Sequence, residues 1–111
     1  MPFEKFANAE NIDKERRKAI SKSIRVISVE ELKKLGEEIF DDPGRPWRQT
    51  FVQFIAENPG ATFHQASAGE GVIFLYCRDV DKGLWYLPGS GLGRLSEGSR
   101  QLMKEAIAAT P

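Results

Sequence analysis

The chain has few residues of the kinds that cross-link proteins or bind metals. Among its 111 residues there are one cysteine, Cys77, and one histidine, His64. A single cysteine excludes an internal disulfide and fits a reducing compartment. A structural zinc site of the usual kind takes four Cys or His ligands, which these counts also exclude. We expect no disulfide framework, no metal and no cofactor.

Long apolar runs are also absent. Nowhere do about eighteen apolar residues follow one another, and residues 1–18 contain acidic side chains but no apolar stretch of signal-peptide length. These absences predict a cytoplasmic protein without a membrane partner.

Net charge of one sign is missing, because 16 basic residues balance 16 acidic ones. A general polyanion binder is expected to have a net-basic face. Nucleic acid is therefore not an expected partner. A basic run over residues 14–18, continued by Lys22 and Arg25, favours a solvated helix face, with weak nucleic-acid binding as the alternative.

The chain does contain enough apolar material for a core. Hydrophobic residues make up 41% of it and include seven Phe, two Trp and two Tyr. At this length such a content supports folding without covalent links. We predict one globular domain over residues 1–111, in which residues 1–9 are allowed to be flexible.

Apolar spacing predicts two or three helices in the N-terminal half. An amphipathic helix begins near Ile12. Residues 24–27 form either the end of this helix or a short strand. The sequence Ser28-Val29-Glu30-Glu31 is a capping box that starts the next helix. A third helix follows Pro46 and places Trp47, Phe51, Phe54 and Ile55 on one face.

After Gly60 the pattern changes to that of strands. Residues 62–65, 72–77 and 84–87 predict a three-stranded antiparallel meander, with Gly83 in the left-handed position of the second turn. A C-terminal helix capped by Ser96 packs on the sheet. The predicted fold class is α+β.

The middle strand, residues 72–77, is apolar on both faces and is expected to be covered on each. Helices on one side would leave the other face open. A homodimer would cover it.

The glycine-rich stretch over residues 89–94 is the first candidate ligand site. As a loop between the last strand and the last helix it could direct amides toward an anion near a helix N-terminus. The alternative is a flexible turn, since neither common phosphate motif is complete. The residues of this candidate site are Gly89, Ser90, Gly91, Gly93 and Arg94.

Aromatic and arginine side chains supply a candidate protein interface. Trp and Arg are enriched in interface hot spots. The residues concerned are Arg45, Trp47, Arg48 and Trp85, with core packing an equal alternative for Trp47.

No catalytic residues are predicted. Cys77 ends an apolar strand, so a small buried side chain is a better interpretation than a nucleophile paired with His64. Asp41, Asp42, Asp79 and Asp81 lack the spacing of a calcium loop.

Three functional hypotheses follow. The first is a non-catalytic module that binds a protein partner and could form a homodimer. The second is a protein that binds a small molecule, a nucleotide or phosphate at residues 89–94, and this hypothesis includes an enzyme that acts on such a ligand. The third is weak nucleic-acid binding by the first helix.

Overall fold

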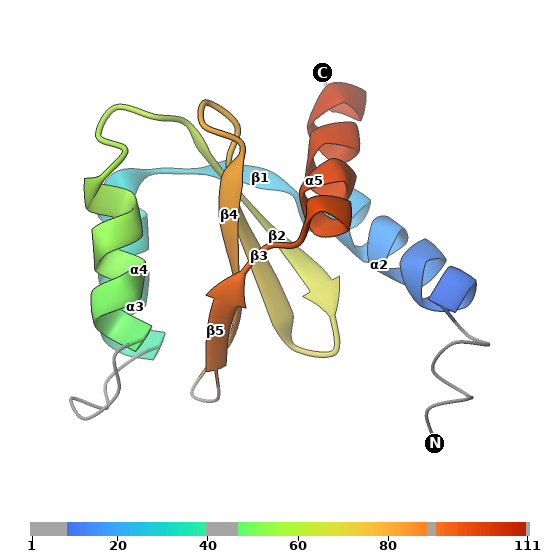
Figure 1. Cartoon of the computed structure of the whole chain (residues 1–111), viewed down its shortest axis with the longest axis horizontal. Helices are drawn as coiled ribbons and strands as arrows, with labels where there is room; N and C mark the ends of the chain where they lie inside the picture. Colours follow the sequence, from blue (N-terminus) through green and yellow to red (C-terminus); the bar gives the residue numbers. More distant parts are fainter. Residues whose placement is uncertain (1–8, 40–46, 89–90, 111) are drawn as a thin grey trace.

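The computed structural model describes residues 9–39, 47–88 and 91–110, with side chains for 14–38, 49–88 and 91–110. Figure 1 shows the elements, which are α2 (Ala9–Ser23), β1 (Arg25–Ile27), α3 (Val29–Ile39), α4 (Trp47–Ala56), β2 (Phe63–Gly69), β3 (Val72–Cys77), β4 (Lys82–Leu87), β5 (Gly91–Arg94) and α5 (Glu97–Ala109). Over these ranges the fold is α+β, as predicted, with three helices before β2 and one after β5.

The strands of the described residues form one antiparallel sheet in the order β1–β2–β3–β4–β5. The predicted meander is present as β2, β3 and β4, but the prediction of only three strands is wrong. One added strand is β1, so residues 24–27 contain a strand that pairs with β2. The other is β5, which pairs with β4 where a loop was expected. Both are short edge strands, which limits pairing with other chains.

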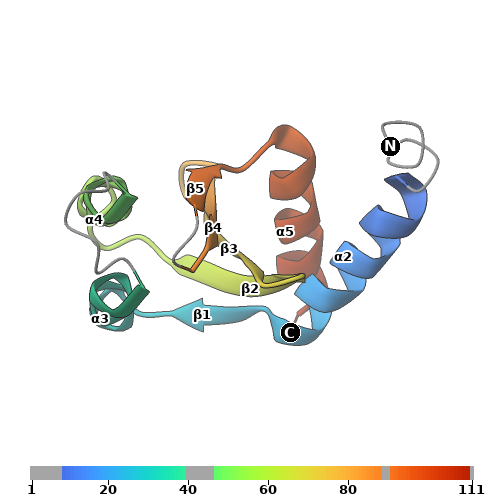
Figure 2. The ribbon, with the colours of Figure 1, turned by 90° about the horizontal axis from the view of Figure 1, so that it is seen from below.

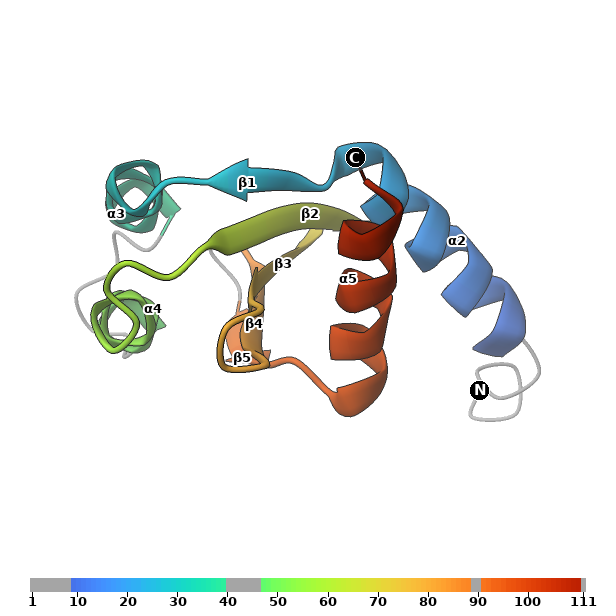
Figure 3. The same ribbon diagram turned by 90° about the horizontal axis from the view of Figure 1, so that it is seen from above.

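Helices cover both faces of this sheet, with α3 and α4 on one side and α2 and α5 on the other (Figures 2 and 3). The middle strand, β3, supplies both cores. Leu75 and Cys77 pack in the α3–α4 cluster, and Phe74 and Tyr76 pack in the α2–α5 cluster. The predicted two-sided cover of this strand is confirmed. The homodimer is not needed for that purpose, because α2 and α5 supply the second cover.

Side-chain caps begin two of the helices, as predicted. The Ser28 hydroxyl accepts a hydrogen bond from the Glu31 amide at 3.1 Å, and the Ser96 hydroxyl accepts one from the Ser99 amide at 3.2 Å. The Glu31 carboxylate, which a full capping box directs to the Ser28 amide, lies 2.6 Å from the Arg25 guanidinium. Each cap is worth about 1 kcal/mol.

Residues in the left-handed region close the turns between β2, β3 and β4. Glu70 and Gly71 have φ angles of 56° and 81°, the pair of positive angles that a type I′ turn requires. In the next turn the left-handed residue is Asp81, with φ of 51°. The prediction that Gly83 takes this role is wrong. Gly83 lies within β4, where a Cβ would be 2.5 Å from the Leu75 carbonyl oxygen.

Candidate functional site

The structure places the predicted ligand residues on a strand. Gly91, Gly93 and Arg94 belong to β5 and pair with β4, so the expectation of a loop is wrong for residues 91–94. In an antiparallel pair alternate residues bond to the partner strand and the others point along the edge. These amides therefore do not converge on one point. Outside the described residues lie Gly89, Ser90 and Arg45, and the side chains of Trp47 and Arg48.

Trp85, the remaining predicted interface residue, packs across the glycines of β5. A Cβ at Gly93 would lie 2.5 to 2.7 Å from three atoms of the indole ring, and a Cβ at Gly91 would lie 3.7 Å from two others. Trp85 and Gly93 are directly opposite one another in the sheet. Aromatic rings that cover cross-strand glycines stabilise sheet edges. The glycines thus have a packing role beside Trp85, which joins the α2–α5 cluster as a partly buried member.

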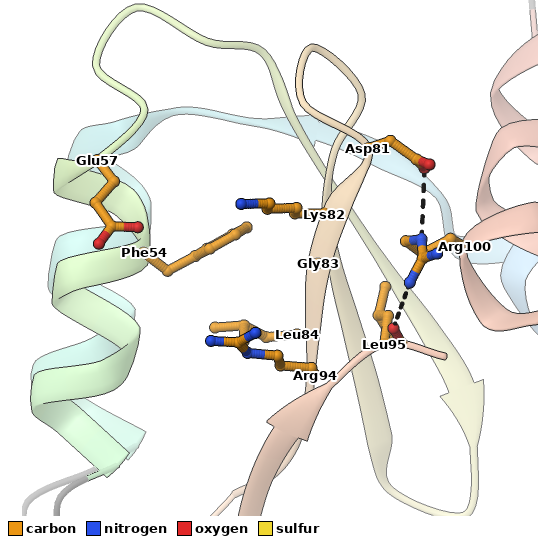
Figure 4. Close-up of a pocket in the computed structure, with 9 residues that line it drawn as sticks. All are labelled: Phe54, Glu57, Asp81, Lys82, Gly83, Leu84, Arg94, Leu95 and Arg100. Carbon is orange, nitrogen blue, oxygen red and sulfur yellow. Dashed lines mark hydrogen bonds and ion pairs between the residues drawn. The ribbon is translucent and has the colours of Figure 1, made fainter. Parts of the chain in front are cut away.

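A hollow beside the end of β5, which we name the α4 cavity, has a volume of about 320 Å³ (Figure 4). Pockets for small molecules begin at about this size. Its lining comes from the C-terminal part of α4 and the residue after it, the turn before β4, the start of β4, the end of β5 with the residue after it, and α5. The lining residues are Phe54, Glu57, Asp81, Lys82, Gly83, Leu84, Arg94, Leu95 and Arg100. Only Arg94 among them is a predicted site residue.

The α4 cavity forms because β4 extends past the end of β5. Leu84 is opposite Arg94, the last residue of β5. The Leu95 amide then donates a hydrogen bond to the Gly83 carbonyl oxygen at 2.9 Å, and the chain continues to α5. Lys82, the first residue of β4, therefore has no described strand beside it on that side.

Apolar and charged side chains divide the α4 cavity. Phe54 of α4 and Leu84 of β4 are 9% and 4% exposed and supply apolar surface. Lys82 and Arg94 extend from neighbouring strands toward α4, and Glu57 lies at the C-terminal end of α4 (Figure 4). Alternate residues of a strand share a face, so Lys82 and Leu84 lie on the same side of the sheet. Directly opposite residues also share a face, which adds Arg94 to this set.

Two cations of the α4 cavity have no partner among the described residues. Neither Lys82 nor Arg94 takes part in an ion pair or a side-chain hydrogen bond within that part of the chain. The Glu57 carboxylate accepts a hydrogen bond from the side-chain amide of Gln53 in α4 at 3.0 Å. Uncompensated charges on the walls of a concave site attract ligands of opposite charge.

The other two charged residues of the α4 cavity are already engaged. The Tyr76 hydroxyl donates to the Asp81 carboxylate at 2.7 Å, and the same carboxylate oxygen lies 3.1 Å from the Lys104 ammonium and 3.6 Å from Arg100 Nε. The hydrogen bonds from Tyr76 and Lys104 lower the pKa of Asp81. Arg100 also donates to the Leu95 carbonyl oxygen at 2.9 Å. These contacts hold one wall of the cavity in place.

Burial is the main reason that the pKa of the Tyr76 hydroxyl is raised, and its hydrogen bond to Asp81 adds to the effect. Tyr76 is fully buried in the α2–α5 cluster. The phenol therefore stays protonated and donates to Asp81 throughout the physiological range.

Two further hollows, of about 300 and 370 Å³, share Arg16 of α2 as a lining residue, and both are also lined by Ser96 and Ser99 at the start of α5. The basic run of α2 reaches this region. The Arg17 guanidinium lies 2.9 Å from the Glu105 carboxylate, and the Arg16 guanidinium lies 5.7 Å from the centre of the Phe74 ring. These two arginines are engaged within the fold, and nucleic-acid binding by the run stays a prediction.

Cys77 and His64 lie on opposite faces of the sheet. Cys77 is fully buried, which confirms its interpretation as a small core residue. It is opposite Phe63, and both belong to the α3–α4 cluster. Successive strand residues point to opposite faces, so the His64 imidazole is directed away from the thiol. Burial, followed by the Arg78 charge, lowers the pKa of His64.

Within 9–39, 47–88 and 91–110, no group of three or more His, Cys, Asp or Glu residues is placed to hold a metal ion. Over those ranges no helix combines the length and the apolar character needed to cross a membrane. Comparisons of the chain with protein-family models, curated proteins and solved structures each found no match.

Proposed function

We propose that the protein is a non-catalytic binding module whose ligand is a small organic anion held in the α4 cavity. One observation carries the proposal: Lys82 and Arg94 extend into the same cavity without partners among the described residues, next to the apolar side chains of Phe54 and Leu84. Small-molecule sites combine mostly apolar walls with a few polar groups that fix orientation.

The two cations suit a carboxylate or a similar monoanion. An arginine fork binds a carboxylate with two parallel hydrogen bonds, and a lysine adds a compact charge. Lys82 lies two residues from Leu84, which is opposite Arg94, so the two cations are diagonal neighbours about 7 to 8 Å apart. Long side chains at such positions can reach one anionic group. Glu57 and Asp81 line the same cavity. Their charges disfavour a ligand with several negative charges.

This proposal develops the small-molecule hypothesis. The anion is bound by the side chains of Lys82 and Arg94 rather than by the amides of residues 89–94. The macromolecular module has less support, because interface cores are rich in aromatic and apolar side chains. The large apolar side chains exposed on the described part of the chain are Val26 in β1, Val52 in α4 and Val80 in the turn between β3 and β4.

The first test is a titration with 3-phenylpropanoate, which joins a carboxylate to an apolar ring. Its uncharged amide, 3-phenylpropanamide, is the matched control. Isothermal titration calorimetry or amide chemical shifts should show binding of the carboxylate at about millimolar affinity, near −4 kcal/mol. The amide should bind at least several-fold more weakly, because it lacks the charge that Lys82 and Arg94 attract.

Variants locate the binding. Lys82→Gln and Arg94→Gln should each weaken 3-phenylpropanoate about three- to tenfold, because each removes one partly exposed charge contact. Lys33→Gln, which removes an exposed charge from α3, should leave the affinity unchanged. Equal binding of the carboxylate and the amide, or affinity that survives both cavity variants, would contradict the proposed function.

A further inference from the structure

The α4 cavity carries charges of both signs on opposite walls. Lys82 and Arg94 belong to the sheet, and Glu57 directly follows the last residue of α4 (Figure 4). Phe54, one turn before Glu57 and within α4, lies between Glu57 and the two cations in this view. A ligand that fills the cavity therefore meets cations on one side, a carboxylate on the other and an aromatic ring between them.

Glu57 keeps capacity to bind a further donor. Its Oε1 accepts one hydrogen bond, from Gln53. A carboxylate offers about four acceptor positions on its two oxygens. Among the described residues, Glu57 has no ion pair. Its negative charge is therefore not balanced by a neighbouring cation.

A ligand with only a negative charge pairs with Lys82 and Arg94 but supplies no positive charge for the Glu57 carboxylate. Its apolar part would displace water from Glu57 without supplying a counter-charge, and loss of water from a charged group is costly. A ligand with only a positive charge would face Lys82 and Arg94. The charges of the lining are complementary to a molecule that carries one charge of each sign.

We infer that the α4 cavity selects zwitterions, with the ligand carboxylate at Lys82 and Arg94 and an ammonium group at Glu57. A small amino acid with an apolar side chain has this chemistry, since the side chain can contact Phe54 and Leu84. The inference rests on the proposed function, which supplies the anion contacts, and adds Glu57 as the residue that determines specificity.

The test compares molecules that differ by one charged group. Phenylalanine carries both charges, 3-phenylpropanoate lacks the ammonium and phenethylamine lacks the carboxylate. A fourth compound, 3-amino-3-phenylpropanoate, places the two charges one carbon further apart. We expect at least one of the two zwitterions to bind about fivefold more tightly than 3-phenylpropanoate, as a partly exposed charge contact allows, and phenethylamine to bind most weakly.

Glu57→Gln separates this role from the anion contacts. The variant should bind phenylalanine and 3-phenylpropanoate with equal affinity, whereas Lys82→Gln should weaken both. Glu38→Gln, an exposed carboxylate on α3, is the matched control and should keep the preference for the zwitterion. An amide correlation spectrum that matches the wild type outside the cavity shows that each variant remains folded.

The outcomes distinguish the two proposals. If 3-phenylpropanoate binds as tightly as both zwitterions, or if the preference survives Glu57→Gln, zwitterion selection is overturned while anion binding stands. If no carboxylate in the series binds, the proposed function itself fails, and the inference fails with it.

Discussion

Gly93→Ala tests the packing between β5 and Trp85. The added Cβ would lie 2.5 Å from Trp85 Nε1, 2.6 Å from Cε2 and 2.7 Å from Cζ2. These separations are well below the usual contact distance of about 3.5 to 4.0 Å between heavy atoms. Either the indole must leave its position or β5 must move away from β4.

Both responses lose packing. Burial of a large apolar side chain contributes about 1.5 to 3 kcal/mol, and an extra methyl in a packed region costs about 1 to 3 kcal/mol. Trp85 is partly buried against the α2–α5 cluster. We therefore expect Gly93→Ala to lower the free energy of unfolding by about 2 kcal/mol. In a domain of this size that lowers Tm by roughly 8 to 16 °C.

Gly91→Ala is the matched control on the same strand. Its Cβ would lie 3.7 Å from Trp85 Cη2 and Cζ3, an ordinary contact distance. Alanine also restricts the unfolded chain more than glycine does. This variant should be neutral or more stable by up to about 1 kcal/mol. Thermal and urea unfolding followed by circular dichroism measure both effects.

A double-mutant cycle tests the cause. In a Trp85→Ala background the obstruction is gone, so Gly93→Ala should no longer destabilise the protein. If Gly93→Ala and Gly91→Ala have the same effect, or if the cost of Gly93→Ala persists without the indole, the packing argument is refuted.

Three further changes test other parts of the fold. Gly83→Ala should destabilise more than Gly93→Ala, because its Cβ would meet the Leu75 carbonyl oxygen, a backbone atom that cannot rotate away; urea unfolding measures this. The pKa of Asp81 is lowered in the folded state, so its contribution to the free energy of unfolding is present at neutral pH and is lost as the pH falls below about 4. Asparagine tolerates the left-handed φ at this position. Asp81→Asn should therefore show a smaller decline in the urea midpoint between pH 6 and pH 2. Ser96→Ala should cost about 1 kcal/mol through loss of the α5 cap, measured by urea unfolding at pH 7.

Each of these changes has a result that contradicts it. Wild-type stability of Gly83→Ala would mean that the close approach between β4 and β3 relaxes freely. If the urea midpoints of Asp81→Asn and the wild type decline in parallel as the pH falls, titration of Asp81 does not contribute to the pH dependence of stability. For Ser96, a Thr variant that loses as much stability as the Ala variant would point away from the hydroxyl cap.

Local features of the fold could be predicted from the sequence. The Ser28 and Ser96 caps act over three residues, so the residue types alone identify them. The run Val72–Cys77 is apolar at every position, and only a strand covered on both faces can bury all of it. Burial of Cys77 follows from the same run.

The edge strands depend on tertiary contacts. Residues Gly91–Arg94 have a composition that disfavours strands, with glycine at alternate positions. They form β5 because β4 offers a partner and Trp85 covers the glycines. The pattern over residues 24–27 is compatible with a helix end or a short strand, and pairing with β2 makes Arg25–Ile27 a strand.

The residues of the candidate site could likewise be predicted only in part from the sequence. Arg94 was predicted as a ligand residue from the glycines before it, but the structure surrounds it with residues from α4, β4 and α5. No sequence spacing connects Glu57 with Lys82, because α4 and β4 meet only by tertiary packing, as in the edge contact between the Phe51 and Tyr86 rings. Residue types alone determined the core-forming runs, the helix caps and the lack of cross-links. Only tertiary structure decided which charges face one cavity, because that depends on where β5 ends and where α4 packs.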